Sequence, residues 1–196
     1  MSFFKTLSIL SLTICAPFLV QASVFIEPSI GYRSHHLKTT ALDNSTVDYK
    51  MTTPTYGLKL GYRSLIGIDI NLAYDYASGK ATVSPLEEKN SFTHSTASVQ
   101  LGVNALGAMK IYLGMGFSND LKIQEGILNS DIQLKGQAYQ AGLQFKVFPM
   151  VMLGMQYNLN QFKSVQGRNF TSGEEIDRYF SKIDSQDYTF SISTSF

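Results

Sequence analysis

The segment YTFSISTSF, residues 188–196, alternates between apolar and small polar side chains. Tyr188, Phe190, Ile192 and Phe196 share one parity, and the positions between them hold serine and threonine. A period of two predicts a β-strand with one apolar and one polar face. Most domains end in a few loose polar residues, whereas we expect this strand to be paired with a neighbour to its last residue.

Seven further segments repeat this alternation, and helical periodicity is nearly absent. They are residues 24–33, 53–63, 66–76, 94–106, 109–118, 137–148 and 150–160. Each has about the 9–11 residues that a tilted strand needs to cross a bilayer. Their polar face carries many glycines, serines and amides and too few lysines and glutamates for a solvated surface. This face therefore suits the narrow, filled interior of a small barrel.

The connections between these segments alternate between short and long. Short turns are expected around 64–65, 106–108 and 148–149, and long connections at 34–52, 77–93, 119–135 and 161–186. A membrane barrel with short periplasmic turns and long outer loops gives this alternation directly. We predict an all-β fold: an eight-stranded, antiparallel, up-and-down transmembrane barrel with three short periplasmic turns, four long extracellular loops and both termini in the periplasm.

The composition and the first residues restrict the class of protein. Lys and Arg number 16 against 15 Asp and Glu, and this balance argues against a partner made of nucleic acid. Residues 1–22 are typical of a cleaved secretory signal peptide, with Lys5, an apolar run and small residues at the cleavage site. The barrel domain is then expected to span residues 23–196. Cys15 lies in the signal segment, so we expect neither a disulfide nor a Cys-ligated metal.

Aromatic residues gather toward the two ends of the predicted strands, which is typical of the girdles of membrane barrels. Tyr32, Tyr56, Tyr74, Tyr76, Phe117, Tyr139, Tyr157 and Tyr188 lie toward the long connections, and Tyr62 and Phe148 lie toward the turns. Ordinary β-propensity is the alternative explanation for so many tyrosines.

The last strand resembles the C-terminal signal that the assembly machinery of outer-membrane β-barrels reads. Tyr188, Phe190, Ile192 and Phe196 occupy the matching positions, and Thr194 departs from the larger apolar residue usual there. GLQFKVFPMVMLGMQYNLNQF, residues 142–162, is similar to the penultimate hairpin of small barrels of the OmpA-transmembrane-domain and OmpX/Ail type. The resemblance implies an integral protein of the Gram-negative outer membrane, surrounded by lipid and lipopolysaccharide.

The resemblance also implies a non-enzymatic function through surface loops, in adhesion, envelope integrity or host-defence evasion. A host or surface ligand would then bind the loops, and no cofactor is expected. Two alternatives are a narrow porin-like channel and a barrel enzyme that modifies lipid A. The filled interior argues against the channel.

Charged residues on the polar parity predict an interior network. Its expected members are Glu27, Arg33, Lys59, Arg63, Asp69, Asp75 and Lys146. Folding about the turn at 64–65 places Lys59 opposite Asp69 or Asn71, and the preceding strand brings Glu27 near Lys59. Buried charges need partners because an isolated one costs several kcal/mol. Two interpretations stay open: a static network that fills the barrel, and a gated path for ions.

The histidines predict neither a metal site nor a catalytic site. His35 and His36 are adjacent, so on a strand they point to opposite faces and do not converge on one metal. His94 and Thr96 resemble the His-x-Ser arrangement of lipid A deacylase barrels. Their parity turns both inward, away from lipid, which argues against that enzyme.

The segment SGEEIDRYFSKID, residues 172–184, carries the only helical signal. Ile176, Tyr179, Phe180 and Ile183 have helical spacing, and Ser172 with Glu175 resembles a capping box. We expect a short amphipathic helix with an apolar contact face. This face either packs over the barrel mouth, stays in a solvated loop, or contacts a partner or the outer leaflet.

Overall fold

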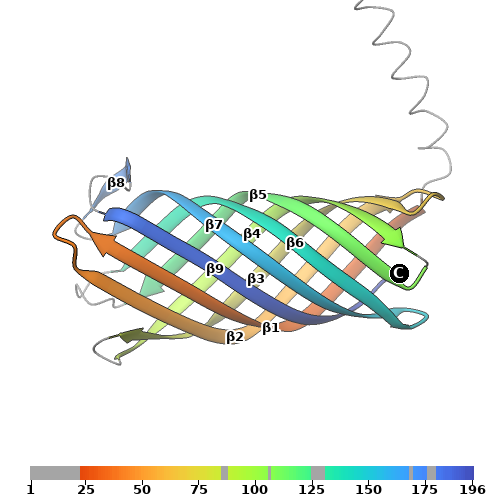
Figure 1. Cartoon of the computed structure of the whole chain (residues 1–196), viewed down its shortest axis with the longest axis horizontal. Coiled ribbons are helices and arrows are strands. Elements are labelled where there is room, and N and C mark those ends of the chain that lie inside the picture. Colours follow the sequence, from red (N-terminus) through yellow and green to blue (C-terminus); the bar gives the residue numbers. More distant parts are fainter. Residues whose placement is uncertain (1–22, 85–87, 106, 125–130, 168–169, 176–179) are drawn as a thin grey trace, which may run out of the picture.

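The computed structural model describes residues 23–84, 88–105, 107–124, 131–167, 170–175 and 180–196, and it shows a closed antiparallel β-barrel (Figure 1). The strands are β1 (Ser23–Ala41), β2 (Thr46–Arg63), β3 (Ile68–Ser84), β4 (Glu88–Ala105), β5 (Met109–Gln124), β6 (Ile132–Phe148), β7 (Val151–Gly167), β8 (Phe170–Glu175) and β9 (Phe180–Thr194). Each long strand pairs with the next, and β9 pairs with both β7 and β1. The prediction of eight antiparallel strands in a ring is confirmed, and β8 is a short addition paired with β7.

Three tight turns lie at one end, which we call the short-turn end. Between β2 and β3 the turn spans residues 64–67, and Gly67 adopts a φ of 82°, which glycine allows without strain. This four-residue turn sets Arg63 opposite Asp69 and Lys59 opposite Ala73. The expected pairing of Lys59 with Asp69 or Asn71 is therefore wrong, because the turn is longer than the one assumed.

The strands continue far beyond the predicted spans at the other end, which we call the hairpin end. β1 has 19 residues and β2 has 18, so only residues 42–45 separate them. The connections expected at 34–52, 77–93 and 119–135 are present but consist mostly of strand. Among the described residues, no helix has the length and apolarity needed to cross a membrane.

From the short-turn end to the middle of the barrel, the wall has apolar side chains outside and polar side chains inside. On β3, Leu72 is 58% exposed whereas the neighbouring Asn71 is 2% exposed. Tyr188, Phe190, Ile192 and Phe196 on the last strand also point outward. The predicted direction of the two faces is confirmed over this band.

The hairpin end reverses this arrangement. Its inward side chains form an apolar cluster: Leu37, Tyr49, Met51, Ala81, Val83, Phe92, Leu121, Ile123, Ile132, Leu134 and Val165. Outward positions here are polar, such as Lys38, Lys50 and Thr52. A β-sheet in water buries its apolar face, so the reversal is what a wall that has left the bilayer requires.

The last strand closes the ring to its final residue. Phe196 and Ile26 exchange two backbone hydrogen bonds, with N–O distances of 3.0 and 3.1 Å. β9 also pairs with β7 from Thr194 to Ser185. Closure leaves no free sheet edge in this band, as a wall surrounded by hydrocarbon needs.

The expected helix over residues 172–184 is wrong for its described part. Residues 172–175 belong to β8, and residues 180–184 belong to the start of β9. Phe180 and Ile183 pack against the apolar cluster instead of forming an outer contact face. Ile176 and Tyr179 of the expected contact face, and the expected signal peptide at 1–22, lie outside the described residues.

Candidate functional site

The barrel interior, or lumen, contains three groups of buried polar side chains at successive heights. These side chains occupy the inward-facing positions of the strands, since successive residues of a strand point to opposite faces of the sheet. Four of the predicted network members are 0–5% exposed: Glu27, Arg33, Lys59 and Asp69. Each of these charges has an oppositely charged neighbour, as burial requires.

The first group lies at the short-turn end around Asp69. Arg63 contacts both carboxylate oxygens of Asp69, at 3.0 and 3.2 Å, and Asn104 donates a hydrogen bond of 2.9 Å. The Nζ of Lys110 lies 2.9 Å from Oδ2 of Asp69. Arg63 remains partly exposed, so this group faces the open end of the barrel.

The second group lies in the middle of the lumen around Glu27. Lys59 lies directly opposite Glu27 in the β1–β2 ladder, and its Nζ is 3.5 Å from Oε1. Gln144 reaches the same oxygen from β6, at 2.6 Å. The Nζ of Lys59 also lies 4.4 Å from the centre of the Tyr112 ring, close enough for a cation–π contact. The predicted proximity of Glu27 and Lys59 is confirmed.

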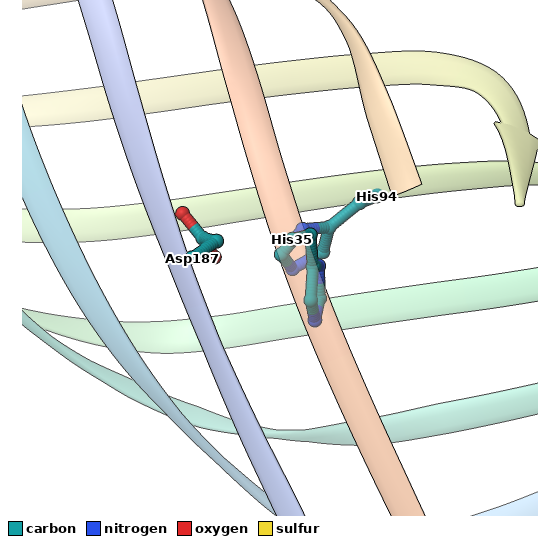
Figure 2. Close-up of side chains that lie close together, drawn as sticks. All are labelled: His35, His94 and Asp187. Carbon is teal, nitrogen blue, oxygen red and sulfur yellow. The ribbon is translucent and has the colours of Figure 1, made fainter. Parts of the chain in front are cut away.

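The third group lies nearer the hairpin end and joins Arg33, His35, His94 and Asp187. Arg33 donates a hydrogen bond of 3.1 Å from Nη1 to Nδ1 of His94, and its Nε lies 3.6 Å from Oδ1 of Asp187. The rings of His35 and His94 have centroids 4.9 Å apart, and Asp187 lies beside them on β9 (Figure 2). His36 points outward to Asp48, which confirms that the two adjacent histidines face opposite sides.

The hydrogen bonds of His94 fix which of its nitrogens carries a proton. A guanidinium can only donate, so Nδ1 must accept from Arg33. Nε2 then donates to Oδ1 of Asn119, at 2.6 Å. Asn119 continues the chain of hydrogen bonds to Asn160, which donates to Asp187.

His35, His94 and Asp187 bring three ligand atoms within 4.8 Å of one another, which is a spacing that a metal ion could use. Arg33 argues against such an ion, because its positive charge already touches His94 and Asp187. A metal bound at Nδ1 of His94 would have to displace the guanidinium. These residues therefore fit an Arg–Asp–His network better than a metal centre.

One predicted member of the network, Lys146, takes another place, whereas Asp75 faces inward as predicted. Lys146 has the inward parity but is exposed, because it lies at the rim of the short-turn end beside a register shift in β6. It lines a hollow there together with Arg63 and Met150. Asp75 is half-buried on the inner face of β3. The prediction that Lys146 belongs to the buried network is wrong.

Sequence reasoning missed several buried members of the network, among them Asp187, Lys110 and Asn119. Lys110 is 2% exposed and touches the first group, although the segment beginning at Met109 shows its inward parity plainly. Asn119 is inward because a β-bulge shifts the register between Gly116 and Asn119. Strict alternation from Phe117 would have turned Asn119 outward, so no sequence signal predicted its place.

Contacts across the lumen fill it. Gln144 on β6 reaches Glu27 on β1, Tyr112 on β5 reaches Gln156 on β7, and Gln100 on β4 reaches Gln140 on β6. His94 and Thr96 are 1% and 3% exposed, which confirms that they face inward. Eight strands leave an interior just wide enough for side chains, and these side chains occupy it.

The outer surface of the hairpin end carries a belt of lysines, with one exposed lysine on each of the eight wall strands. The lysine belt consists of Lys38, Lys50, Lys80, Lys89, Lys122, Lys135, Lys163 and Lys182. On seven strands the lysine lies farther toward the hairpin end than an outward Tyr or Phe of the same strand, and on β4 it follows no outward aromatic residue. Lys182 contacts Asp184 at 2.7 Å, and Lys163 donates to Gln137. The predicted girdle thus has a basic belt beyond it.

Comparisons with known proteins identify a family and several structural neighbours. A family model described as outer membrane protein beta-barrel domain matches residues 11–196. One structural neighbour is Ail, the attachment invasion locus protein of Yersinia pestis, solved in complex with the heparin analogue sucrose octasulfate. Ail is 14% identical to this chain. The match covers 89% of this chain and 99% of that chain, with a TM-score of 0.56. No curated protein sequence matches the chain.

Two other solved barrels are similar to this chain. OprG from Pseudomonas aeruginosa is 14% identical over 90% of this chain and 97% of its own, with a TM-score of 0.53. Neisserial surface protein A is 16% identical over 89% of this chain and 99% of its own, with a TM-score of 0.52. At these identities the likeness shows the fold alone.

Proposed function

Because the chain belongs to the outer membrane protein beta-barrel domain family, and is thus an integral protein of the Gram-negative outer membrane, we propose that it is a non-enzymatic barrel that acts through its hairpin end. Short turns of such barrels face the periplasm and longer connections face outward. The hairpin end is then the cell surface, and both termini lie on the periplasmic side. Folding would use the barrel-assembly machinery, with Tyr188, Phe190, Ile192 and Phe196 as its signal.

The lysine belt is the observation that carries this proposal. Eight cationic side chains surround the wall, and on seven strands they lie four to six residues beyond an outward aromatic residue. We place the phosphate groups of the outer leaflet at this level. A lysine ammonium is a compact charge that attracts such anionic groups. The belt therefore fits the phosphates of lipopolysaccharide, and among the roles implied by the fold it favours envelope integrity.

Ail suggests a second class of anionic ligand for the lysine belt, since it was solved with the sulfated sugar sucrose octasulfate. A sulfated glycan of a host surface and a phosphorylated glycolipid both present anions on a saccharide. The belt lies on the outer side of the strands, between the outward aromatic residues and the hairpin connections, at the level where the headgroups of the leaflet would lie. This position favours the glycolipid, and an adhesive role would use the hairpin tips in addition.

Two features support a non-enzymatic, closed barrel over the alternatives. His94 and Thr96 are buried, so they cannot reach a lipid outside the wall. The cross-lumen contacts of Glu27, Gln144 and Tyr112 fill the space that a channel would need. Mass spectrometry of lipid A, with and without expression of the protein, tests the first point. We expect identical spectra, and a loss or gain of an acyl chain would show that the protein is an enzyme.

The lysine belt is tested by placing the protein in nanodiscs that contain lipid A with or without its phosphates. We expect a higher melting temperature with the phosphates, and a smaller difference at high salt because salt screens exposed charges. Replacing Lys38, Lys50 and Lys182 by glutamine removes three neighbouring cations on β1, β2 and β9 and should reduce the difference. Lys146→Gln is the matched control, since Lys146 is exposed at the opposite end.

The outcomes separate the two sources of anion. An unchanged phosphate effect in the triple variant, or an equal loss in Lys146→Gln, would refute the role of the belt. Calorimetric titration with sucrose octasulfate is the second arm. Binding of this probe with no effect of lipid A phosphates would assign the belt to soluble sulfated glycans and remove the leaflet as its partner.

A further inference from the structure

An apolar cavity lies inside the hairpin end, beyond the polar groups of the lumen. Its volume is about 210 Å³, and its lining includes Leu37, Val47, Tyr49, Ile123, Ile132 and Leu134. These side chains come from β1, β2, β5 and β6, so the cavity lies between opposite walls. Thr39 and Ser45 also line the cavity, but most of its lining is apolar. A cavity of about 150 Å³ lined by Leu, Ile and Phe stays dry and binds benzene or xenon in another protein. We call this cavity the apolar chamber.

The wall beside the chamber is interrupted between β7 and β9. The β7–β9 ladder ends at the pair Asn160–Ser185, and from Ser164 onward β7 pairs with β8 instead. β9 meanwhile continues along β1 up to Phe180. Residues 161–163 of β7 and 181–184 of β9 thus lie between the two ladders, and we call this place the side window.

A second cavity, of about 460 Å³, lies at the side window. Its lining mixes outward side chains such as Leu159 and Gln161 with inward side chains such as Asn160 and Ser185. The cavity extends along the place where the β7–β9 ladder ends, and among the described residues no ladder pair joins residues 161–163 to residues 181–184. The window begins just beyond the outward pair Tyr157 and Tyr188, whose rings are 5.1 Å apart.

Ile183 connects the window to the chamber. It lines the cavity at the window and also packs against the apolar cluster that surrounds the chamber. Phe162, on the opposite border of the window, packs against the same cluster. An apolar molecule at the window therefore meets apolar side chains on both borders, and the lumen below it is blocked by Arg33 and His94.

We propose that the apolar chamber binds a small apolar molecule, about the size of a single hydrocarbon ring, which exchanges with the outer leaflet through the side window. The chamber offers such a molecule apolar contacts in place of water. The window begins beyond the outward tyrosines, at the level of Lys163 and Lys182, where molecules that leave the surface of the leaflet arrive. The polar groups below the chamber keep the molecule from passing down the lumen.

Benzene is the probe, and methyl NMR of the isoleucine-labelled protein in nanodiscs is the readout. The methyl signals of Ile123 and Ile132 in the chamber should shift with benzene and reach saturation. Those of Ile70 and Ile26, which point outward, should shift only in proportion to the benzene dissolved in the lipid. Ala41→Phe enlarges a residue that lines the chamber and should abolish the saturable shift. Leu134→Phe fills the chamber from the opposite wall and serves as the second variant.

The route is tested with cysteines at Gln161 and Asp184, both of which line the cavity at the window. Bridging them with a bifunctional thiol reagent should change the Ile132 signal from one averaged peak to separate free and bound peaks, because exchange becomes slow. The same variant before bridging is the control. Unchanged exchange after bridging would overturn the side window as the route.

Two results would overturn binding in the chamber. In the first, Ile123 and Ile132 shift without saturation, as the outward isoleucines do. In the second, a saturable shift survives in folded Ala41→Phe and Leu134→Phe, which would place benzene elsewhere. Heat-modifiable gel mobility and unchanged Ile70 signals verify that each variant is folded.

Discussion

Arg33 on β1 and Asp187 on β9 form a buried ion pair across the seam where the first strand meets the last, with Nε 3.6 Å from Oδ1. Both side chains are at most 1% exposed. Asn158 and Asn160 of β7 also donate hydrogen bonds to Asp187. One carboxylate of β9 thus contacts both neighbouring strands, β1 and β7, in addition to the backbone ladders that join them.

Replacing Asp187 by asparagine should destabilise the barrel strongly. The change leaves Arg33 buried without its counter-charge, and loss of one partner of a buried pair costs about 3–5 kcal/mol. Denaturant unfolding in detergent, followed by heat-modifiable gel mobility, measures the loss. Asp184→Asn is the control: Asp184 is an exposed neighbour paired with Lys182, and such pairs contribute about 0–1 kcal/mol. Equal effects of the two changes would contradict the assigned role of the seam pair.

Lys59→Ala should destabilise the barrel by leaving Glu27 uncompensated in the middle of the lumen. We expect a loss of about 3–5 kcal/mol, since Glu27 is fully buried and Lys59 nearly so. Adding Glu27→Gln should restore part of the loss, because the amide removes the isolated charge. Planar-bilayer recordings of Lys59→Ala test the ion-path interpretation at the same time: a static network predicts no gating by voltage. Full stability of Lys59→Ala would show that Glu27 does not need this partner.

Replacing Phe196 by alanine should reduce assembly in cells more than it reduces stability in detergent. The backbone bonds between Phe196 and Ile26 remain after the change, while the outward ring is lost. Surface proteolysis of intact cells and the amount of folded protein in the outer membrane give the readout. Phe148→Ala removes an equally exposed ring at the same end and should assemble normally. Normal assembly of Phe196→Ala would remove the proposed signal.

Zinc should not stabilise the unmodified barrel at neutral pH, although His35, His94 and Asp187 lie close together. The guanidinium of Arg33 holds Nδ1 of His94 and repels a second cation. Melting curves with and without zinc, and with a chelator, test this expectation. In Arg33→Met the same three residues lose that cation, and any zinc effect should be confined to this variant. A zinc-dependent rise in the unmodified protein would contradict the Arg–Asp–His description.

The transmembrane band could be read from the sequence because lipid imposes a strict alternation. Every outward apolar residue of β3, from Ile68 to Tyr76, was placed on the correct face. The pairing of Glu27 with Lys59 also followed, since these strands are adjacent and their polar faces converge. The register between β2 and β3 could not be predicted from the alternation. It depends on the length of the turn at residues 64–67, which is set by the local conformation at Gly67.

The hairpin end was misread for a different reason. Residues 46–52 alternate as regularly as the rest, but Tyr49 and Met51, like Leu37 on β1, lie on the inward parity. The outward positions of this region are polar, and for this reason the alternation typical of a lipid-facing strand does not extend into it. The expected helix in 172–184 failed similarly, because Phe180 and Ile183 have both helical spacing and places in the apolar cluster.

The sequence alone determined that this protein is a closed barrel of eight strands, each with an apolar and a polar face. The reason is that a residue's parity fixes which side of its strand it faces. Only the tertiary structure decided which inward residues meet. A bulge before Asn119 and a four-residue turn before Ile68 set the register, and the departure of β7 from β9 after Asn160 opens the side window. These choices depend on contacts between strands that are distant in sequence, and parity along one strand carries no information about them.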